Sequence, residues 1–493
     1  MSVDTRQRDR TVVPAGDLGG EKPHRPAASS PPSVSGSLTR RLHVRSLLPR
    51  LIALMVGTGC ALVFAEVALR MLYPAYTHFY VWPPNTAMVF RPLRSVLPDA
   101  SGPSHFTINS QGIRGRELPA GDAYRILAVG GSSTECLYLD DTKAWPALLE
   151  GLLQRSTAQK EVWVGNVGKS GMNSRDHVLH IKYLPREYPG IDAIVLLVGV
   201  NDLTVALSQG NHYAPPPPLT AAGAEALQIR RAFAIAPGSL TRPPTDSLSL
   251  LDAPSYKSTA VYQLLKRARG AVKDGMSKRG LIQDESGRAL ATWRDHRRHA
   301  ARILEEAPDL GPALKEYATN LDRIVGLARA QSIRLVLMTQ PTLWRADLDR
   351  RAQESLWLGG IGDFQLQSGQ PYYSAAALAE VMRRFNDALL DVCRVDRAEC
   401  FDLAAKIPKD TTVFYDDVHF TEHGAQVVAE DVATYLRGRP PLAPETAKPG
   451  PSLRTREAND LRHTARVGEP GEGCRPRDVR GDLSPGGRAC GRR

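Results

Sequence analysis

The stretch YRILAVGGSST, residues Tyr124–Thr134, joins a short apolar run to a turn made of two glycines and two serines. An apolar run of this length, bounded by turn residues, predicts a buried strand over Tyr124–Val129. At such a strand-to-helix turn, the hydroxyl of Ser132 is expected to be exposed, with backbone N–H groups directed at the same point. Taken alone, the turn indicates only that a strand ends and a helix begins, because glycine and serine commonly serve that purpose.

The same strand pattern recurs along the chain and alternates with helical stretches. Four further strands are predicted at Val162–Val167, Ala193–Val198, Arg334–Met338 and Cys400–Leu403. Helical stretches are predicted at Ala144–Gln154, Pro312–Ala330, Ala375–Val392 and Gly424–Leu436. This alternation predicts an α/β fold in which a parallel sheet is covered by helices on both faces. In such sheets the working residues lie in loops at the carboxyl ends of the strands.

Changes in composition divide the chain into parts. The predicted parts are a disordered cytoplasmic tail over 1–45, a transmembrane anchor over 46–73, a β and turn segment over 74–122, the main domain over 123–438, and a disordered basic tail over 439–493. Within the main domain, residues 203–310 are too long for a plain loop and are predicted to form an inserted helical subdomain or mobile cap. The insertion contains Pro215–Pro218, followed by predicted helices at Ala224–Phe233, Thr259–Lys273 and Ala289–Glu306.

The predicted anchor rests on an uncharged run, Leu51–Ala65, which continues as EVALRMLY to Tyr73. A helix over Leu51–Tyr73 would be about 35 Å long at about 1.5 Å per residue, which is enough to cross a bilayer. Arginines precede it at positions 40, 41, 45 and 50, so the positive-inside rule places everything after Pro74 outside the cytoplasm. The alternatives are a signal peptide cleaved after Ala65, a lipid attached at Cys60, or a buried core helix.

The distribution of charge argues against a nucleic-acid partner. The formal charge of the chain is +11, of which residues 1–50 carry +5 and residues 441–493 carry +4. The body of the protein is therefore nearly neutral, and it contains no basic segment with interleaved aromatic residues.

None of the six cysteines forms a CxxC pair, which makes a structural zinc site improbable. Cys393 and Cys400 are seven residues apart at a helix-to-strand connection. They are either a disulfide, in an oxidising compartment, or two ordinary buried thiols.

The loops after the other predicted strands also contain candidates for chemistry. In Asn166–Gly171, after the second strand, the glycines let the backbone approach a ligand closely. Asn201, after the third strand, can donate its side-chain N–H to a developing oxyanion. In FYDDVHFT, after the fifth strand, the spacing of Asp416 and His419 lets the carboxylate accept from one ring nitrogen while the other takes a serine proton.

Together these segments resemble the four sequence blocks of the SGNH (GDSL-like) hydrolases, named for Ser, Gly, Asn and His. GGSST, NVGKSG, GVND and DDVH occur in the order of those blocks within Tyr124–Leu436, apart from the insertion. The resemblance implies a three-layer α/β/α, flavodoxin-like sheet and needs no cofactor or metal. It also implies a catalytic triad and an oxyanion hole, with these residues: Ser132, Asp416 and His419 for the triad, and the N–H groups of Ser132 and Gly171 with the Asn201 amide for the hole. The segment INSQGIRG, residues 108–115, is similar to one that precedes this domain in membrane-anchored bacterial relatives.

The resemblance is incomplete at one position, since the family's usual Asp in the first block is Gly131 here. Alternatives within the site are Ser133 as the nucleophile and Asp417 as the orienting acid, both of which the block alignment disfavours. His419 and His423 are four residues apart and can form a metal face on a helix, but no third ligand is evident. Cys136 is interpreted as a packing residue, because a reactive thiol needs its own base.

The expected function is that of an exported serine esterase acting on O-acyl esters through an acyl-enzyme on Ser132. Acyl groups on cell-surface or secreted polysaccharide are the favoured substrate class, and the predicted N-terminal helix gives the membrane contact. The alternatives are an O-acyltransferase that uses the same residues, and a carbohydrate-binding protein that has kept the fold without catalysis.

Overall fold

The computed structural model describes residues 44–72, 77–98, 102–156, 161–237 and 287–442, together with several positions between 259 and 269. The chain divides into two compact units, Met1–Phe64 and Ala65–Arg493. The predicted tails over 1–45 and 439–493 lie almost wholly outside the described residues.

Helix α1, Val44–Leu72, covers the predicted anchor. The most apolar 18-residue window within its segment Pro49–Leu72 has a mean hydropathy of 2.1, and none of that window is buried, which disfavours a core helix. Its length and composition fit a membrane span, and they equally fit a signal sequence near the N-terminus. Anchoring therefore stays a prediction.

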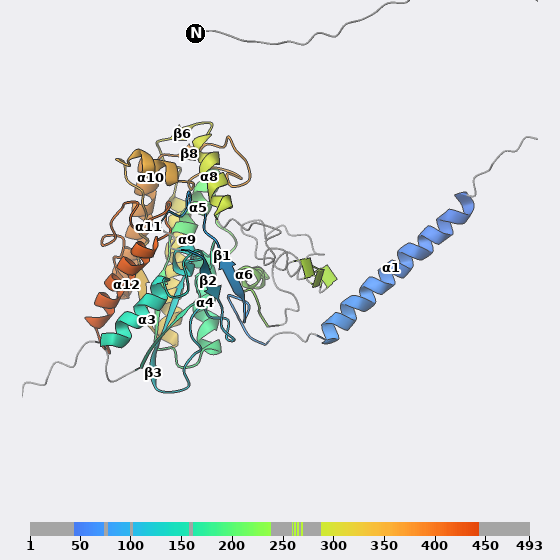
Figure 1. Cartoon of the computed structure of the whole chain (residues 1–493), viewed down its shortest axis with the longest axis horizontal. Coiled ribbons are helices and arrows are strands. Elements are labelled where there is room, and N and C mark those ends of the chain that lie inside the picture. The colour runs from blue at the N-terminus through green and yellow to red at the C-terminus, as the bar shows by residue number, and fades with distance from the viewer. Residues whose placement is uncertain are drawn as a thin grey trace, which may run out of the picture. The chain divides into compact units, whose positions relative to one another are not determined.

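Five parallel strands form the central sheet, in the order β4-β3-β5-β7-β9. Figure 1 shows β3 of this sheet among the helices that surround it. Their bounds are β3 Ala123–Gly130, β4 Glu161–Asn166, β5 Ala193–Leu197, β7 Arg334–Met338 and β9 Glu399–Phe401. This is the flavodoxin-like order that the resemblance to the SGNH blocks implies, and all five predicted strands are present. The order reverses at β3, between β4 and β5, and open α/β sheets bind ligands at the carboxyl ends of strands beside such a reversal.

Helices cover the sheet in two groups. α3 packs against α12, while α4 and α11 each pack against α9. The bounds of the covering helices are α3 Trp145–Ser156, α4 Ser174–Glu187, α9 Gly311–Ala330, α11 Ala375–Asp396 and α12 Glu422–Arg437. The predicted α/β/α architecture is therefore confirmed.

Helix α4 is the main element that the sequence prediction missed. Its buried face includes His177, His180 and Arg175 as well as aliphatic residues, so the apolar period is interrupted by polar side chains. A signal for it does exist, since Asn173 and Asp176 form a reciprocal capping box at its start.

The described part of the insertion is helical, with one correction. The structure contains α5 Val200–Gln209, the 3-10 turn η1 Gly210–His212, α6 Ala224–Ala232 and α8 Arg288–Arg298. The helix predicted at Ala289–Glu306 is wrong beyond Arg298, because Ile303–Leu304 forms strand β6, which pairs with β8, Tyr372–Tyr373. Most of the predicted helix Thr259–Lys273 lies outside the described residues. The short helix α10, Arg350–Ser355, packs against α8.

The segment before the sheet packs against it through Arg114. Strands β1, Ala87–Phe90, and β2, Ser104–Thr107, form an antiparallel pair, and the chain then reaches the edge strand β4, where the Arg114 N–H donates to the Asn166 carbonyl oxygen (2.9 Å). The buried Arg114 guanidinium donates to the carbonyl oxygens of Glu135 (2.5 Å), Cys136 (3.0 Å) and Leu139 (2.7 Å). This residue therefore fixes the chain that follows the glycine-serine turn.

A disulfide joins Cys393 near the end of α11 to Cys400 on β9. Of the two possibilities that the sequence left open, the structure has the cross-link, which is the form expected in an oxidising compartment.

Candidate functional site

The turn after β3 places Ser132 at the first position of the short helix α2, Ser132–Glu135. Its side chain is partly buried, and its hydroxyl forms no hydrogen bond with any residue that the structure describes. The neighbouring Ser133 is 3% exposed, and its hydroxyl donates to the Val418 carbonyl oxygen at 3.1 Å. Ser133 is therefore committed to a structural bond, which supports Ser132 as the reactive serine.

The loop after β9 holds Asp416 against His419. The ring Nδ1 of His419 lies 2.7 Å from Asp416 Oδ2, and the side chains are 15% and 0% exposed. Asp416 Oδ1 accepts the backbone N–H groups of Val418 (3.0 Å) and His419 (2.9 Å). The carboxylate thus fixes both the ring and the loop, and the His419 Nε2 is left without a partner among the described residues.

The buried pair shifts the pKa of both groups. Burial alone would raise the pKa of Asp416, but the charge of His419 and the hydrogen bonds that the carboxylate accepts hold it below its usual value. Burial alone would lower the pKa of His419, but the charge and hydrogen bond of Asp416 raise it above 6.5. An imidazole in this setting is a stronger base than a free histidine, and its protonated form is stabilised.

Asp417 points to different partners. It accepts the Trp344 indole N–H (2.7 Å) and the backbone N–H of Trp357 (2.7 Å). Burial and the charge of Asp416 raise the pKa of Asp417. The structure therefore pairs His419 with Asp416 and not with Asp417, as the block alignment predicts.

Trp357 is a site residue that the sequence analysis missed. Its indole N–H donates to Asp416 Oδ2 at 3.0 Å, the same oxygen that holds His419. Its ring packs on Trp293 of α8, with centroids 4.6 Å apart. No spacing signal links residue 357 to residue 416, since they are 59 positions apart.

Gly171 and Asn201 lie at the ends of β4 and β5, on either side of the serine turn. Gly171 has φ +79°, a conformation that favours glycine, and a Cβ there would meet nothing within 4 Å. The N–H groups of Ser132 and Gly171 donate to no described residue. Asn201 Nδ2 donates one hydrogen to the Met172 carbonyl oxygen at 2.7 Å, which leaves its second hydrogen available.

The departure at Gly131 has a steric explanation. A Cβ at this position would lie 2.4 Å from Asn201 Nδ2 and 3.4 Å from the Met172 carbonyl oxygen. The Asn201 amide therefore occupies the space that a side chain in the first block would need, and the family's usual Asp does not fit without moving it.

Glu135 ties the first block to the second. It is 2% exposed, and its Oε2 accepts the backbone N–H of Ser170 (3.0 Å) and also the Ser170 hydroxyl. Burial raises the pKa of Glu135 to about 7. Because Ser170 directly precedes Gly171, Glu135 fixes the loop that presents the Gly171 N–H.

Two alternatives within the site can now be placed. Cys136 has φ 51°, is buried, and has a pKa raised to about 11 by that burial, so its thiol stays protonated and unreactive near neutral pH. His423 is exposed in the first turn of α12, whereas His419 is partly buried and bonded to Asp416, so the two rings are in different environments.

The structure brings the serine turn and the Asp416–His419 loop into contact, but the hydrogen bond expected between Ser132 and His419 is not formed. The Ser133–Val418 contact joins the serine turn to the loop that carries His419, yet Ser132 Oγ and His419 Nε2 are not hydrogen-bonded to each other. In unliganded enzymes such bonds are commonly long and tighten with substrate bound. The groups needed for acyl transfer, namely a hydroxyl, a buried acid–imidazole pair and free N–H donors, all lie in loops that follow the carboxyl ends of the strands.

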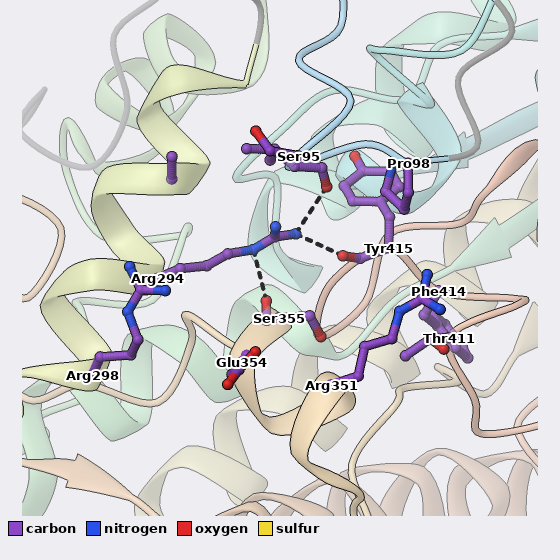
Figure 2. Close-up of a pocket in the computed structure, with 12 residues that line it drawn as sticks. Ser95, Pro98, Arg294, Arg298, Arg351, Glu354, Ser355, Thr411, Phe414 and Tyr415 are labelled. Carbon is purple, nitrogen blue, oxygen red and sulfur yellow. Dashed lines mark hydrogen bonds between the residues drawn. The ribbon is translucent and has the colours of Figure 1, made fainter.

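A pocket of about 330 Å³ lies between helices α8 and α10 and the loop that carries Asp416 and His419, which is called the histidine loop below. It is lined in part by Tyr415, whose ring stacks on that of His419 with centroids 5.6 Å apart. Figure 2 shows Arg294 of α8 reaching into it, where the guanidinium donates to the carbonyl oxygens of Ser355 (3.0 Å) and Tyr415 (2.6 Å). Arg294 thus braces the loop of the acid–imidazole pair from the side of the insertion.

Comparison with known proteins gives one family and several distant structures. The sequence model of the GDSL-like Lipase/Acylhydrolase family matches residues 128–427. No curated protein matches the chain in sequence.

Three solved structures illustrate the structural similarity. The acetylxylan esterase Axe2 from Geobacillus stearothermophilus is 14% identical, with a TM-score of 0.31, over 65% of this chain and 95% of its own. A lipolytic protein of the G-D-S-L family from Veillonella parvula is 11% identical, with a TM-score of 0.30, over 64% of this chain and 100% of its own. The α/β hydrolase LAE5 from the metagenome of Lake Arreo, Spain, is 13% identical, with a TM-score of 0.31, over 65% of this chain and 98% of its own. These likenesses are too distant to carry an argument about function.

Proposed function

Because the chain belongs to the GDSL-like lipase/acylhydrolase family, we propose that it is a serine esterase that cleaves O-acyl esters through an acyl-enzyme on Ser132. The observation that carries the proposal is the buried Asp416–His419 pair, 2.7 Å between Oδ2 and Nδ1. It is held beside a turn in which Ser132 has the one partly exposed hydroxyl, since Ser133 and Thr134 are buried.

The first half of the reaction forms the acyl-enzyme. His419 Nε2 takes the Ser132 proton as Oγ bonds to the ester carbonyl carbon, and Asp416 stabilises the imidazolium that results. The tetrahedral intermediate then breaks its bond to the alcohol oxygen, and His419 returns the proton to that oxygen. In the second half, water bonds to the acyl carbon as His419 Nε2 takes one of its protons. The second tetrahedral intermediate then breaks its bond to Ser132 Oγ, and His419 returns the proton to Oγ, which releases the carboxylic acid and restores the hydroxyl.

The negative oxygen of each tetrahedral intermediate needs donors in place before it forms. The backbone N–H groups of Ser132 and Gly171 and the second amide hydrogen of Asn201 are the proposed donors, and none of the three is used elsewhere among the described residues. Removing one such donor typically lowers kcat by about 10²–10³.

The proposed setting is outside the cytoplasm, with acyl groups on surface or secreted polysaccharide as substrates. Two observations support export: the apolar helix α1 with arginines before it, and the Cys393–Cys400 disulfide. The same acyl-enzyme can pass its acyl group to a sugar hydroxyl, so the product decides between hydrolysis and transfer.

The test is release of p-nitrophenol from p-nitrophenyl acetate by the purified full-length chain in detergent. Wild-type protein is expected to turn over, Ser132→Ala to fall to background, and the matched control Ser133→Ala to retain measurable activity. Equal background rates for wild type and Ser132→Ala would favour a non-catalytic carbohydrate-binding protein. Free acetate as product indicates hydrolysis, and acetylated sugar acceptor indicates transfer.

A further inference from the structure

A second cavity, of about 700 Å³, opens between α4, α5, α6 and α9 and is separate from the pocket behind the histidine loop. This size is within the range of small-ligand sites. Its polar wall consists of Arg175, Asp202, Tyr213, Gln228, Arg231 and Glu316.

The cavity is lined by residues that are neighbours in the chain of the proposed oxyanion donors. Two of its lining residues, Asn173 and Asp202, follow Gly171 and Asn201 within two residues in the chain. Arg231 of α6 donates from Nη2 to the Gly171 carbonyl oxygen at 3.0 Å. A ligand in this cavity would therefore lie next to the loops that present the oxyanion donors.

Some polar groups of the wall are bonded within the protein: Arg175 Nε donates to Gln228 Oε1 (3.0 Å), and the Asp202 carboxylate accepts from Ser174. Other groups are held only loosely and keep hydrogen-bonding capacity for a ligand. Arg175 Nη1 lies 3.8 Å from Glu316 Oε1, a separation too long for a hydrogen bond, although the two side chains are only 8% and 15% exposed. The Arg231 Nε is 3.4 Å from Asp176 Oδ2, which is also loose. Tyr213 donates to Glu316 at 2.5 Å and holds that carboxylate at the cavity. Both donors and acceptors are thus presented to a ligand.

The charges in the wall and directly behind it nearly cancel, where the buried Asp176 does not itself line the cavity. Two arginines face the carboxylates of Asp176 and Glu316, while burial raises the pKa of Asp202 to about 7, so it is only partly ionised near neutral pH. A cavity without a large net charge gives little advantage to a strongly ionic ligand. The lining also contains apolar residues, among them Val205, Leu227 and Ala313. A wall that combines apolar surface with donors and acceptors on planar side chains matches a neutral ligand that carries hydroxyl groups on apolar rings.

We propose that this cavity is a glycan-binding subsite, which holds a neutral, uncharged segment of the polysaccharide while its ester is at Ser132. The proposal rests on the proposed esterase function and assigns part of the insertion a role: Tyr213 and α6 belong to residues 203–310 and form one side of the cavity. The adjacent prolines Pro216 and Pro217 add flat apolar surface for sugar rings.

Binding is measured first, in the absence of turnover. Full-length Ser132→Ala protein is titrated calorimetrically with neutral hexasaccharides of xylose, glucose and mannose, and with a hexamer of galacturonate as the ionic comparison. At least one neutral hexasaccharide is expected to bind, and to bind more tightly than the galacturonate hexamer. Binding of none of the neutral sugars, or tighter binding of the uronate, overturns the proposal.

A filling substitution then locates the site. Leu227 lies at the cavity on α6 and is 47% exposed, so Leu227→Trp places a large ring at the cavity without disturbing the core. Leu366→Trp is the matched control, since Leu366 is 80% exposed and does not line the cavity. Leu227→Trp is expected to weaken the sugar binding about tenfold, and the control to leave it unchanged. Equal binding by both variants, with thermal unfolding unchanged, contradicts the assignment.

Failure of the subsite and failure of the esterase function give different results. For an acetylated form of the sugar that binds, Leu227→Trp should lower the ratio of glycan to p-nitrophenyl acetate kcat/KM about tenfold. An equal loss on both substrates counts against the subsite and leaves the esterase intact. Sugar binding in a protein that never hydrolyses p-nitrophenyl acetate refutes the esterase and leaves the subsite intact.

Discussion

Gly131→Ala tests whether the Asn201 amide is an oxyanion donor, without substituting any of the proposed catalytic residues. The new Cβ would lie 2.4 Å from Asn201 Nδ2. The φ of −83° at residue 131 lies outside the left-handed region that favours glycine, and the backbone there is extended. Since the clash is with the end of a side chain, the amide is expected to move and the fold to remain.

The magnitude follows from the contact distances. Nonbonded carbon and nitrogen atoms pack at roughly 3.5 Å, so the amide has to move by about 1 Å. That displacement breaks the 2.7 Å bond from Asn201 to the Met172 carbonyl oxygen and misaligns the second amide hydrogen. Loss of one oxyanion donor costs about 10²–10³ in kcat. Loss of one neutral hydrogen bond costs only about 1 kcal/mol of folding free energy.

The assay compares kcat on p-nitrophenyl acetate with the thermal unfolding midpoint. Gly121→Ala is the matched control, because a Cβ there would meet nothing within 4 Å. If the clash acts through Asn201, the double variant Gly131→Ala, Asn201→Ala should be no slower than Asn201→Ala alone. Wild-type kcat in Gly131→Ala, or losses that multiply in the double variant, would refute the reasoning.

Three further predictions concern the residues around the acid–imidazole pair. Trp357→Phe removes the indole N–H that donates to Asp416, and because a hydrogen bond to a charged group is worth about 1.5–3 kcal/mol, kcat should fall roughly tenfold. The control Trp293→Phe loses only ring packing and should keep near wild-type kcat, so equal effects of the two variants would contradict this role of Trp357. Because the pKa of His419 is raised above 6.5 and only the neutral ring accepts a proton, kcat/KM should fall with decreasing pH through a midpoint above 6.5. Asp416→Asn should move that midpoint to lower pH, and an unmoved midpoint would contradict the pairing of Asp416 with His419. Glu135→Ala frees the loop before the oxyanion glycine and should lower kcat about 10–100-fold, while Glu135→Gln, which still accepts the same hydrogen bonds, should recover most of the rate; no recovery would point to the charge instead.

The strands and their following loops were predictable because the relevant signals are local. Short apolar runs mark the buried parallel strands, and the loop after each carries its own polar residues within a few positions. The strand order cannot be obtained from those runs, and it came from the resemblance to the SGNH blocks. The choice of Asp416 over Asp417 also came from the block spacing, and the bond to His419 agrees with it.

What the sequence did not indicate depends on contacts between distant segments. Trp357 holds Asp416 from a loop 59 residues away, and Arg294 reaches the histidine loop from the insertion. Helix α4 was missed because polar side chains face its buried side, and the second cavity is formed only when α4 meets α5, α6 and α9. The reason for Gly131 is equally nonlocal, since the atom that excludes a side chain there belongs to Asn201.

The most direct test of the account is covalent labelling by a fluorophosphonate, followed by mass spectrometry of the intact protein and its peptides. The account predicts one adduct, on Ser132, which is absent in Ser132→Ala and forms much more slowly in His419→Ala. An unlabelled wild-type protein, or an adduct on Ser133, would contradict the claim that Asp416 and His419 activate the hydroxyl of Ser132.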